Sequence, residues 1–365
     1  MRSLLLPEIR FLSVLPSAPS SPDSTDDSLP TVAEFNECTE DETCINIEDC
    51  TMFGPHFTEP AEWSDELKVE FRQRLCKRES INGVHVYKVC CPPVLITRSG
   101  LRGSDLLNFT TCGAHSENRI AHGKNAELFQ FPWMALLQKN VGKFVCGATL
   151  IAERYVLTAA HCVQNDDIVS VRLGEFDLHN TTDCDSNGEE CAMPVQDIPV
   201  ERIIKHDDYS HWYKRNDIAL IRLSQKASLN DNVIPICLPI GPQMRTTTNN
   251  YIVAGWGTTH DYKPAATLQY AILTLVSTAD CQSQLQIIDP SVKLDENQLC
   301  AIGANLSDNC SGDSGGPLKT ISVSGQFVQY GVVSFGLNTC GKLSAPGVYT
   351  RVESYIDWIL ENMEN

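Results

Sequence analysis

Residues 327–336 read FVQYGVVSFG, a run of β-branched and aromatic residues that ends in glycine. This composition favours a β-strand, because branched side chains fit the pleated surface of a sheet. Similar short runs recur from Ile120 to the C-terminus between Gly, Pro and Asn residues, and they predict an all-β sandwich or barrel. These runs are VSVRLGEF (169–176), IALIRL (218–223), YIVAGWG (251–257) and PGVYTRV (346–352). The final segment, SYIDWILENMEN (354–365), has apolar residues at helical spacing and predicts a terminal helix.

The charge and the hydropathy of the chain argue against two classes of partner, nucleic acid and membranes. The 365 residues include 46 Asp and Glu against 28 Lys and Arg, which gives a formal net charge of −18. Nucleic acid is not expected as a ligand, because phosphate binding needs clustered Lys and Arg. No apolar run approaches the roughly 18 residues that a membrane span needs, so no membrane partner is expected. Residues 11–67 hold 14 acidic residues and no Lys or Arg, so the acidity is mostly N-terminal.

Residues 1–36 are expected to combine a poor signal-like start with a disordered acidic segment rich in Ser, Pro and Asp. Arg2 and an apolar stretch resemble a secretory signal, but Pro7, Glu8 and Arg10 interrupt the stretch. The sixteen cysteines support secretion better, because an even number of cysteines suggests disulfides and an oxidising compartment.

Six cysteines cluster within residues 37–92: Cys38, Cys44, Cys50, Cys76, Cys90 and Cys91. The cluster has no C-x-x-C pair, which argues against a zinc module. A small core held together by three disulfides fits this density, and the sequence alone allows 15 pairings. Residues 93–119 show no strong periodicity and are interpreted as a linker that contains Cys112.

Three short segments carry chemistry: TAAHC (158–162), RNDIAL (215–220) and DNCSGDSGGP (308–317). They supply His161, Asp217 and Ser314 in that chain order. A serine hydroxyl is a weak nucleophile, and it needs an imidazole to accept its proton. The imidazole in turn needs a carboxylate to fix its tautomer and stabilise its charged form. The three segments together therefore predict a catalytic site.

These segments resemble the chymotrypsin-like serine proteases, and the resemblance covers residues 120–365. It implies two six-stranded β-barrels with a C-terminal helix, and it implies no cofactor for catalysis. Ser314 would be the nucleophile, His161 the general base and then acid, and Asp217 the orienting carboxylate. The backbone N–H groups of Gly312 and Ser314 would form the oxyanion hole.

The same resemblance implies specificity and a mode of activation. Asp308 would form the floor of the primary pocket and select Arg or Lys, since a carboxylate can bind a guanidinium bidentately. Three further residues would contribute to substrate binding, namely Ser334, Gly336 and Gly347. The segment Arg119-Ile120-Ala-His-Gly123 resembles a zymogen activation junction. Cleavage after Arg119 would free the amine of Ile120 to pair with Asp313.

Six cysteines that end in an adjacent pair, upstream of such a protease, resemble the clip domain of the arthropod clip-domain serine proteases. An unrelated disulfide module is the alternative interpretation. The resemblance implies the pairs Cys38–Cys90, Cys44–Cys76 and Cys50–Cys91 in residues 37–92. For the remaining ten cysteines it implies Cys112–Cys237, Cys146–Cys162, Cys184–Cys191, Cys281–Cys300 and Cys310–Cys340.

The acidic loop 174–184 suits a structural calcium ion, because calcium prefers hard oxygen ligands on flexible loops. Glu175 and Asp183 would supply carboxylates, and Asp177 and Asn180 would supply carbonyls. A solvated acidic loop without metal is the alternative. Three sequons, at Asn108, Asn180 and Asn305, permit glycosylation in a secreted protein.

Two functions remain as hypotheses. The first is a secreted zymogen of a trypsin-like endopeptidase that cleaves after Arg or Lys. The resemblance places it in an extracellular cascade of a haemolymph-like fluid, in prophenoloxidase activation (melanisation) or the Toll pathway of innate immunity. Its partners would be a downstream zymogen or cytokine-like precursor, an upstream Arg-specific protease and serpin inhibitors. The second is a non-catalytic protease-like regulator, which the presence of His161, Asp217 and Ser314 disfavours.

Overall fold

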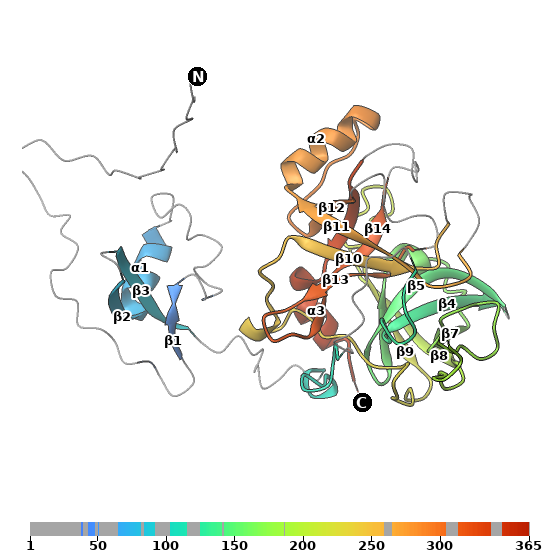
Figure 1. Cartoon of the computed structure of the whole chain (residues 1–365). Coiled ribbons are helices and arrows are strands. Elements are labelled where there is room, and N and C mark those ends of the chain that lie inside the picture. Colours follow the sequence, from blue (N-terminus) through green and yellow to red (C-terminus); the bar gives the residue numbers. More distant parts are fainter. Residues whose placement is uncertain are drawn as a thin grey trace, which may run out of the picture.

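The computed structural model describes residues 38, 43–47, 50, 65–81, 84–91, 103–114, 125–140, 142–185, 187–258, 265–303, 313–336 and 345–364. These residues form one three-stranded sheet and two closed six-stranded β-barrels (Figure 1). The prediction of an all-β protein with two such barrels is therefore confirmed. In the described part of the chain, no helix is long and apolar enough to span a membrane.

The N-terminal unit is a small antiparallel sheet with strand order β1–β3–β2. Its elements are β1 (Thr43–Asn46), α1 (Asp65–Arg74), β2 (Leu75–Ile81) and β3 (Val84–Cys91). Helix α1 packs on the sheet through Phe71, whose ring meets that of Tyr87 edge-on at 6.1 Å. Three disulfides cross-link the unit: Cys38–Cys90, Cys44–Cys76 and Cys50–Cys91. A unit of this size buries little apolar surface, so the cross-links are expected to supply much of its stability.

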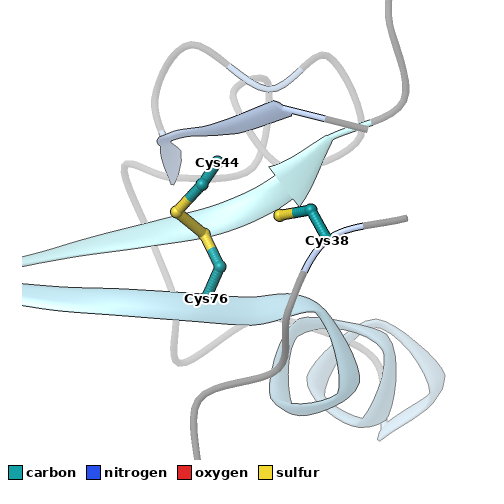
Figure 2. A group of neighbouring side chains, drawn as sticks. All are labelled: Cys38, Cys44 and Cys76. Atoms are coloured by element: carbon teal, nitrogen blue, oxygen red, sulfur yellow. A yellow bond between two sulfur atoms is a disulfide. The ribbon is translucent and has the colours of Figure 1, made fainter. Parts of the chain in front are cut away.

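Two of these disulfides lie next to each other. The sulfur atoms of Cys38, Cys44 and Cys76 lie within 4.8 Å of one another, and Figure 2 shows Cys38 beside the Cys44–Cys76 bond. Each of the three sulfurs belongs to a disulfide, so none is available as a thiolate ligand for a metal ion.

The first barrel has the strand order β4–β5–β6–β9–β8–β7, with every neighbouring pair antiparallel. Its strands are β4 (Met134–Asn140), β5 (Lys143–Ala152), β6 (Tyr155–Thr158), β7 (Ser170–Leu173), β8 (Gln196–Lys205) and β9 (Ala219–Leu223). The predicted strand segments at 169–176 and 218–223 form β7 and β9. Buried Trp133, Leu137, Leu150, Leu157 and Ile218 belong to its core.

The second barrel has the strand order β10–β11–β12–β15–β14–β13. Its strands are β10 (Asn250–Gly255), β11 (Gln269–Val276), β12 (Gln298–Gly303), β13 (Pro317–Ile321), β14 (Phe327–Phe335) and β15 (Gly347–Arg351). The segment 327–336 forms β14, and the runs at 251–257 and 346–352 form β10 and β15. Its core includes buried Leu273, Leu318, Val333 and Tyr349. Figure 1 shows the two barrels side by side, the first in green and the second in orange and red.

The helices of the barrel region are short. Helix α2 (Thr278–Ile288) begins after Ser277, whose side chain accepts a hydrogen bond from the backbone N–H of Asp280 and caps the helix. The predicted C-terminal helix is present as the 3₁₀-helix η8 (Val352–Tyr355) followed by α3 (Ile356–Glu361). The described residues also form the 3₁₀-helices η4 (Ser104–Leu106), η5 (Ala160–Val163) and η6 (Pro242–Met244). Buried Ile359, Leu360 and Met363 join the large core that contains the first barrel.

Residues 103–114, within the predicted linker 93–119, are docked onto the barrels. The backbone N–H of Gly103 donates to the carbonyl of Leu360 at 3.1 Å. The Gln326 side chain donates to the carbonyls of Phe109 and Cys112, each at 3.0 Å. The Cys112–Cys237 disulfide completes the attachment. The segment 103–114 of this linker is thus packed structure rather than a free connection.

The described residues contain seven disulfides, and each is one of the eight pairs that the sequence resemblance implies. The four in the barrel region are Cys112–Cys237, Cys146–Cys162, Cys184–Cys191 and Cys281–Cys300. The remaining expected pair, Cys310–Cys340, lies outside the described residues.

Candidate active site

His161 and Asp217 lie close together because His161 follows β6, Asp217 precedes β9, and these two strands are neighbours in the barrel. Strand β6 ends at Thr158, which pairs with Ala219 at the start of β9. His161 lies in η5 just after β6, and Asp217 lies just before β9. The Nδ1 atom of His161 is 2.8 Å from Asp217 Oδ2, and the backbone N–H of His161 donates to Oδ1 at 2.9 Å. Because Asp217 is fully buried, the carboxylate holds the imidazole without competition from water.

The backbone of Ser314 is fixed next to this pair. The N–H of Gly147 donates to the Ser314 carbonyl at 2.9 Å, and the Thr158 hydroxyl donates to the Gly147 carbonyl at 2.9 Å. The adjacent residue Gly315 has φ +80°, and a Cβ atom there would lie 2.2 Å from Thr158 Oγ1. Only glycine allows this close approach and this conformation. The serine segment of the second barrel therefore lies against the strand end that leads to His161.

Among the described residues, Ser314 makes no hydrogen bond to the His161 side chain. The Nε2 atom of His161 instead lies 3.6 Å from Cys162 Sγ. Catalytic hydrogen bonds are often long in substrate-free enzymes and tighten in the substrate complex. The arrangement therefore places a serine, an imidazole and a buried carboxylate at the junction of the two barrels.

The structure gives Ser334 a contact that the sequence did not predict. The sequence interpretation places Ser334 among the substrate-binding residues. In the structure its hydroxyl donates to Asp217 Oδ2 at 2.5 Å, and the residue is buried. The two residues are 117 positions apart, and no local sequence pattern signals the contact. The hydroxyl of Ser334 thus helps to hold the carboxylate that orients His161.

The other predicted substrate-binding residues are placed only in part. Gly336 follows β14, and a Cβ atom there would meet nothing within 4 Å, which leaves open space on that side. Gly347 is buried at the start of β15, opposite Ala301 of β12. Asp308 and the oxyanion-hole residue Gly312 lie outside the described residues.

The Asp313 carboxylate lies in a cradle of backbone. Its Oδ1 accepts the N–H of Gly257 at 2.9 Å. A Cβ atom at Gly257 would lie 2.6 Å from both carboxylate oxygens, and one at Gly255 would lie 2.1 Å from Oδ1. Any side chain at either glycine would therefore displace Asp313. The predicted partner Ile120 and the junction residue Arg119 lie outside the described residues.

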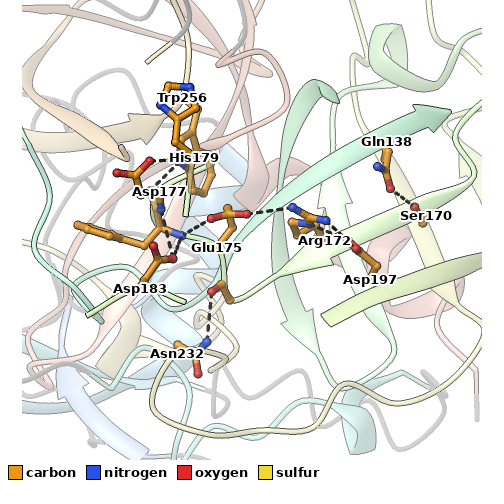
Figure 3. Close-up of polar contacts among 12 residues, drawn as sticks. Gln138, Ser170, Arg172, Glu175, Asp177, His179, Asp183, Asp197, Asn232 and Trp256 are labelled. Atoms are coloured by element: carbon orange, nitrogen blue, oxygen red, sulfur yellow. Dashed lines mark hydrogen bonds and ion pairs between the residues drawn. The ribbon is translucent and has the colours of Figure 1, made fainter. Parts of the chain in front are cut away.

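The acidic loop after β7 brings several carboxylate groups close together (Figure 3). Glu175 and Asp183 are both buried, and Asp183 Oδ1 has no hydrogen-bond partner in the described part of the chain. Burial raises the pKa of both carboxyl groups, and each lies close to other acids. Arg172 donates to Glu175 Oε2 at 3.1 Å and offsets part of this charge. An orphaned, buried carboxylate oxygen in an acidic loop fits a hard cation.

The other two predicted calcium ligands lie in the same loop. The Asp177 carboxylate accepts hydrogen bonds from the His179 N–H and the Thr267 hydroxyl. Its carbonyl accepts the N–H of Asn180 at 2.9 Å and retains a second lone pair. The Asn180 side chain favours the charged form of the Asp183 carboxyl group, against the larger effect of burial on its pKa. The backbone carbonyl oxygens of Asp177 and Asn180 are therefore the atoms with which these two residues could bind a calcium ion.

Two of the three sequon asparagines are described, and both are exposed. Asn108 Oδ1 accepts the backbone N–H groups of Thr110 and Thr111. Asn180 lies on the acidic loop. The third, Asn305, lies outside the described residues.

Comparison with known proteins places these features in a family. Residues 120–359 match the family model described as Trypsin. The CLIP domain-containing serine protease HP8 of Bombyx mori is 38% identical over 352 residues, which cover 90% of this chain and 93% of that protein. Phenoloxidase-activating factor 3 of Holotrichia diomphalia is 36% identical over 333 residues, which cover 88% of this chain and 91% of that protein. The crystal structure of the Drosophila Grass clip serine protease of the Toll pathway has a TM-score of 0.64 and 31% identity, over 88% of this chain and 94% of that one.

These matches, together with the paired barrels, define a serine endopeptidase of the trypsin class. More narrowly, the chain belongs to the arthropod clip-domain serine proteases.

Proposed function

We propose that this chain is the secreted zymogen of a trypsin-like endopeptidase with His161, Asp217 and Ser314 as its catalytic triad. The observation that carries the proposal is the 2.8 Å contact between His161 Nδ1 and the fully buried Asp217 carboxylate, next to the fixed backbone of Ser314. A buried carboxylate in this position holds the proton on Nδ1, so the lone pair of Nε2 is free to act as a base.

The peptide bond is cleaved in two halves, acylation of the enzyme and its deacylation, and each half involves two proton transfers. As Ser314 Oγ bonds to the substrate carbonyl carbon, its proton passes to His161 Nε2. The imidazolium then gives this proton to the leaving nitrogen as the C–N bond breaks and an acyl-enzyme forms. A water molecule repeats the sequence: His161 takes its proton, the hydroxyl bonds to the acyl carbon, and Ser314 leaves with the proton. Asp217 stabilises the imidazolium in both halves.

Specificity and activation are part of the same proposal. Asp308 would select Arg or Lys through a charge-assisted, bidentate contact. Cleavage after Arg119 would release the amine of Ile120, which would pair with the Asp313 carboxylate. The cradle formed by Gly255 and Gly257 supports this step, because it already holds Asp313 in a fixed position.

The names of the relatives suggest where such an enzyme acts. One is named for phenoloxidase activation, and another is described as a protease of the Toll pathway. We infer an extracellular cascade with a protein substrate, an upstream Arg-specific protease and serpin inhibitors. The seven disulfides of the described residues are consistent with an oxidising compartment.

We also propose that the acidic loop binds a structural calcium ion through Glu175 and Asp183, with carbonyl oxygens of Asp177 and Asn180. Asp183 Oδ1, which no described residue hydrogen-bonds, supports this site. Calcium would neutralise the buried carboxylates and stabilise the loop; it has no part in the bond cleavage.

The test is to treat the full chain with an immobilised Arg-specific protease, remove that protease, and assay hydrolysis of an Arg-peptide amide. Wild type should gain activity and show a new N-terminus at Ile120. Arg119→Gln should stay uncleaved and inactive, and Ser314→Ala should be cleaved but inactive. Asp308→Ser should lose hydrolysis after Arg and yet still react with an alkyl fluorophosphonate at Ser314.

Cleaved wild type that neither hydrolyses the amide nor reacts with the fluorophosphonate would favour the non-catalytic regulator instead. Full activity of Ser314→Ala would contradict the triad. Activation of Arg119→Gln at the normal rate would contradict the junction.

A further inference from the structure

The main chain that leads to Asp217 is held from outside its own barrel. The Gln298 side chain of β12 donates to the carbonyl of Lys214 at 3.1 Å. The Thr350 hydroxyl of β15 donates to the carbonyl of Asp217 at 2.8 Å. Both donors are buried and belong to the second barrel. The position of Asp217 therefore depends on contacts across the junction of the barrels.

Asn216 immediately precedes Asp217 in this stretch of main chain. Its φ is +52°, in the left-handed region, and Lys214 two residues earlier has φ +51°. This region costs free energy for residues other than glycine, and asparagine tolerates it best. A segment with two such residues persists only when its surroundings hold it in place.

Both amide atoms of Asn216 are engaged. The Tyr355 hydroxyl, from the C-terminal segment η8, donates to Oδ1 at 2.7 Å. The Nδ2 group donates to the carbonyl of Asp208 at 2.9 Å, on the other side of the loop. Asn216 thus joins the two ends of the loop 208–216 to the C-terminal segment.

Tyr355 is well suited to act as a fixed donor. It is 4% exposed, and its ring meets His206 edge-on at 5.4 Å. Burial raises the pKa of its hydroxyl, and the charges of Asp295 and Asp217 raise it further. The hydroxyl therefore keeps its proton across the working range of the enzyme and always donates to Asn216.

We propose that Asn216 and Tyr355 form a positioning pair that sets the backbone of Asp217 and, through it, the orientation of His161. The pair touches neither substrate nor the reacting atoms, and it rests on the proposed role of Asp217. A displacement of about 1 Å in catalytic geometry can cost on the order of 10²-fold in rate, so the loss of one buried hydrogen bond should be visible in kcat.

The experiment compares Tyr355→Phe, Asn216→Gly and their double variant in the cleaved full chain. Tyr155→Phe is the matched control, because Tyr155 is also buried and, among the described residues, its hydroxyl bonds only the backbone of Glu364. Glycine at 216 accepts the positive φ without strain, so this variant removes the amide contacts alone. The readouts are kcat, KM, the pH profile of kcat/KM and the melting temperature.

Tyr355→Phe should lower kcat about tenfold with KM within twofold, and should move the acid limb of the pH profile. Asn216→Gly should do the same, and the double variant should be no worse than the more impaired single variant, because the two act as one unit. Tyr155→Phe should lower the melting temperature and leave kcat and the pH profile unchanged.

The proposal is overturned if Tyr355→Phe and Tyr155→Phe have the same kcat and pH profile, or if the two pair effects multiply in the double variant. If Tyr355→Phe does not fold, Asn216→Gly decides alone by the same criteria. Asp217→Asn is assayed beside them: if it keeps full activity, the triad assignment fails. If it loses activity while the pair variants keep theirs, only the pair fails.

Discussion

The ammonium group of Lys319 lies 4.1 Å from the centre of the Phe131 ring, inside the protein, with no hydrogen-bond acceptor among the described residues. Lys319 lies on β13, and its cross-strand partner Gln329 on β14 carries a buried amide oxygen that likewise has no hydrogen-bond partner in the described structure. Burial lowers the pKa of Lys319 from 10.5 to about 7. A cation–π contact offsets only part of the cost of removing the ammonium from water.

Lys319→Met should therefore stabilise the protein, by about 1–4 kcal/mol, since a buried charge is replaced by an apolar side chain of similar length. The folded-state pKa lies below the unfolded value, so the unfolded chain binds more protons between pH 7 and 10.5. Wild-type stability should therefore be lowest below pH 7 and rise through that range. The advantage of the variant, measured by thermal unfolding from pH 6 to 10, should be largest at pH 6 and shrink toward pH 10.

Lys226→Met is the control, because Lys226 is exposed and pairs with Glu153 on the surface. Its effect should stay below about 1 kcal/mol at every pH. A destabilised Lys319→Met variant, or one whose advantage does not change with pH, would show that the amine has a partner in solution.

Gly315→Ala should abolish most of the activity. Its Cβ atom would lie 2.2 Å from Thr158 Oγ1 and 2.5 Å from the Gly147 carbonyl, at φ +80°. Relief of these contacts must move Ser314 away from His161, so we expect a loss of about 10²-fold or more in kcat. Gly325→Ala is a matched control with φ +81° and open space around the Cβ position. It should cost about 1 kcal/mol of stability and leave kcat unchanged; equal kcat for the two variants would refute the packing argument.

Calcium should raise the melting temperature of the wild-type chain, because an ion that binds only the folded state stabilises it by mass action. At 100 times the dissociation constant the gain is about 2.7 kcal/mol. Magnesium should give much less, since it requires a stricter geometry. Glu175→Ala should lose the calcium response, whereas Asp166→Asn should keep it, because Asp166 pairs with Lys205 outside the acidic loop. An unchanged melting temperature in calcium would remove the proposed site.

Gly103→Ala should loosen the docked segment 103–114. Its Cβ atom would lie 2.5 Å from the Leu360 carbonyl and 2.6 Å from Met363 Cβ. We expect a loss of about 1–3 kcal/mol, read as a lower melting temperature, because the close contact must open. Asp105→Ala, at an exposed position two residues later, should change it little. If Gly103→Ala matches wild type in the full chain, the contact with the C-terminal helix does not hold the segment.

Local sequence was enough to predict an all-β sandwich or barrel, because strand formation depends on short runs such as 251–257 and 327–336 that became β10 and β14. The choice of two six-stranded barrels came from the family resemblance. It was also enough to select His161, Asp217 and Ser314 as candidates, since each lies in a short segment whose residue types suit one step of the chemistry. The seven described disulfides follow pairs that the resemblance implied.

Only the tertiary structure decided which distant side chains hold these residues in place. The Ser334 hydroxyl bonds the Asp217 carboxylate, and the Tyr355 hydroxyl bonds Asn216, across 117 and 139 residues of sequence. Lysine is usually a surface residue, and nothing in the local sequence shows that Lys319 is fully buried. Such contacts depend on how two closed barrels pack against each other, and that packing is set by the sum of many weak interactions between distant segments rather than by any local pattern.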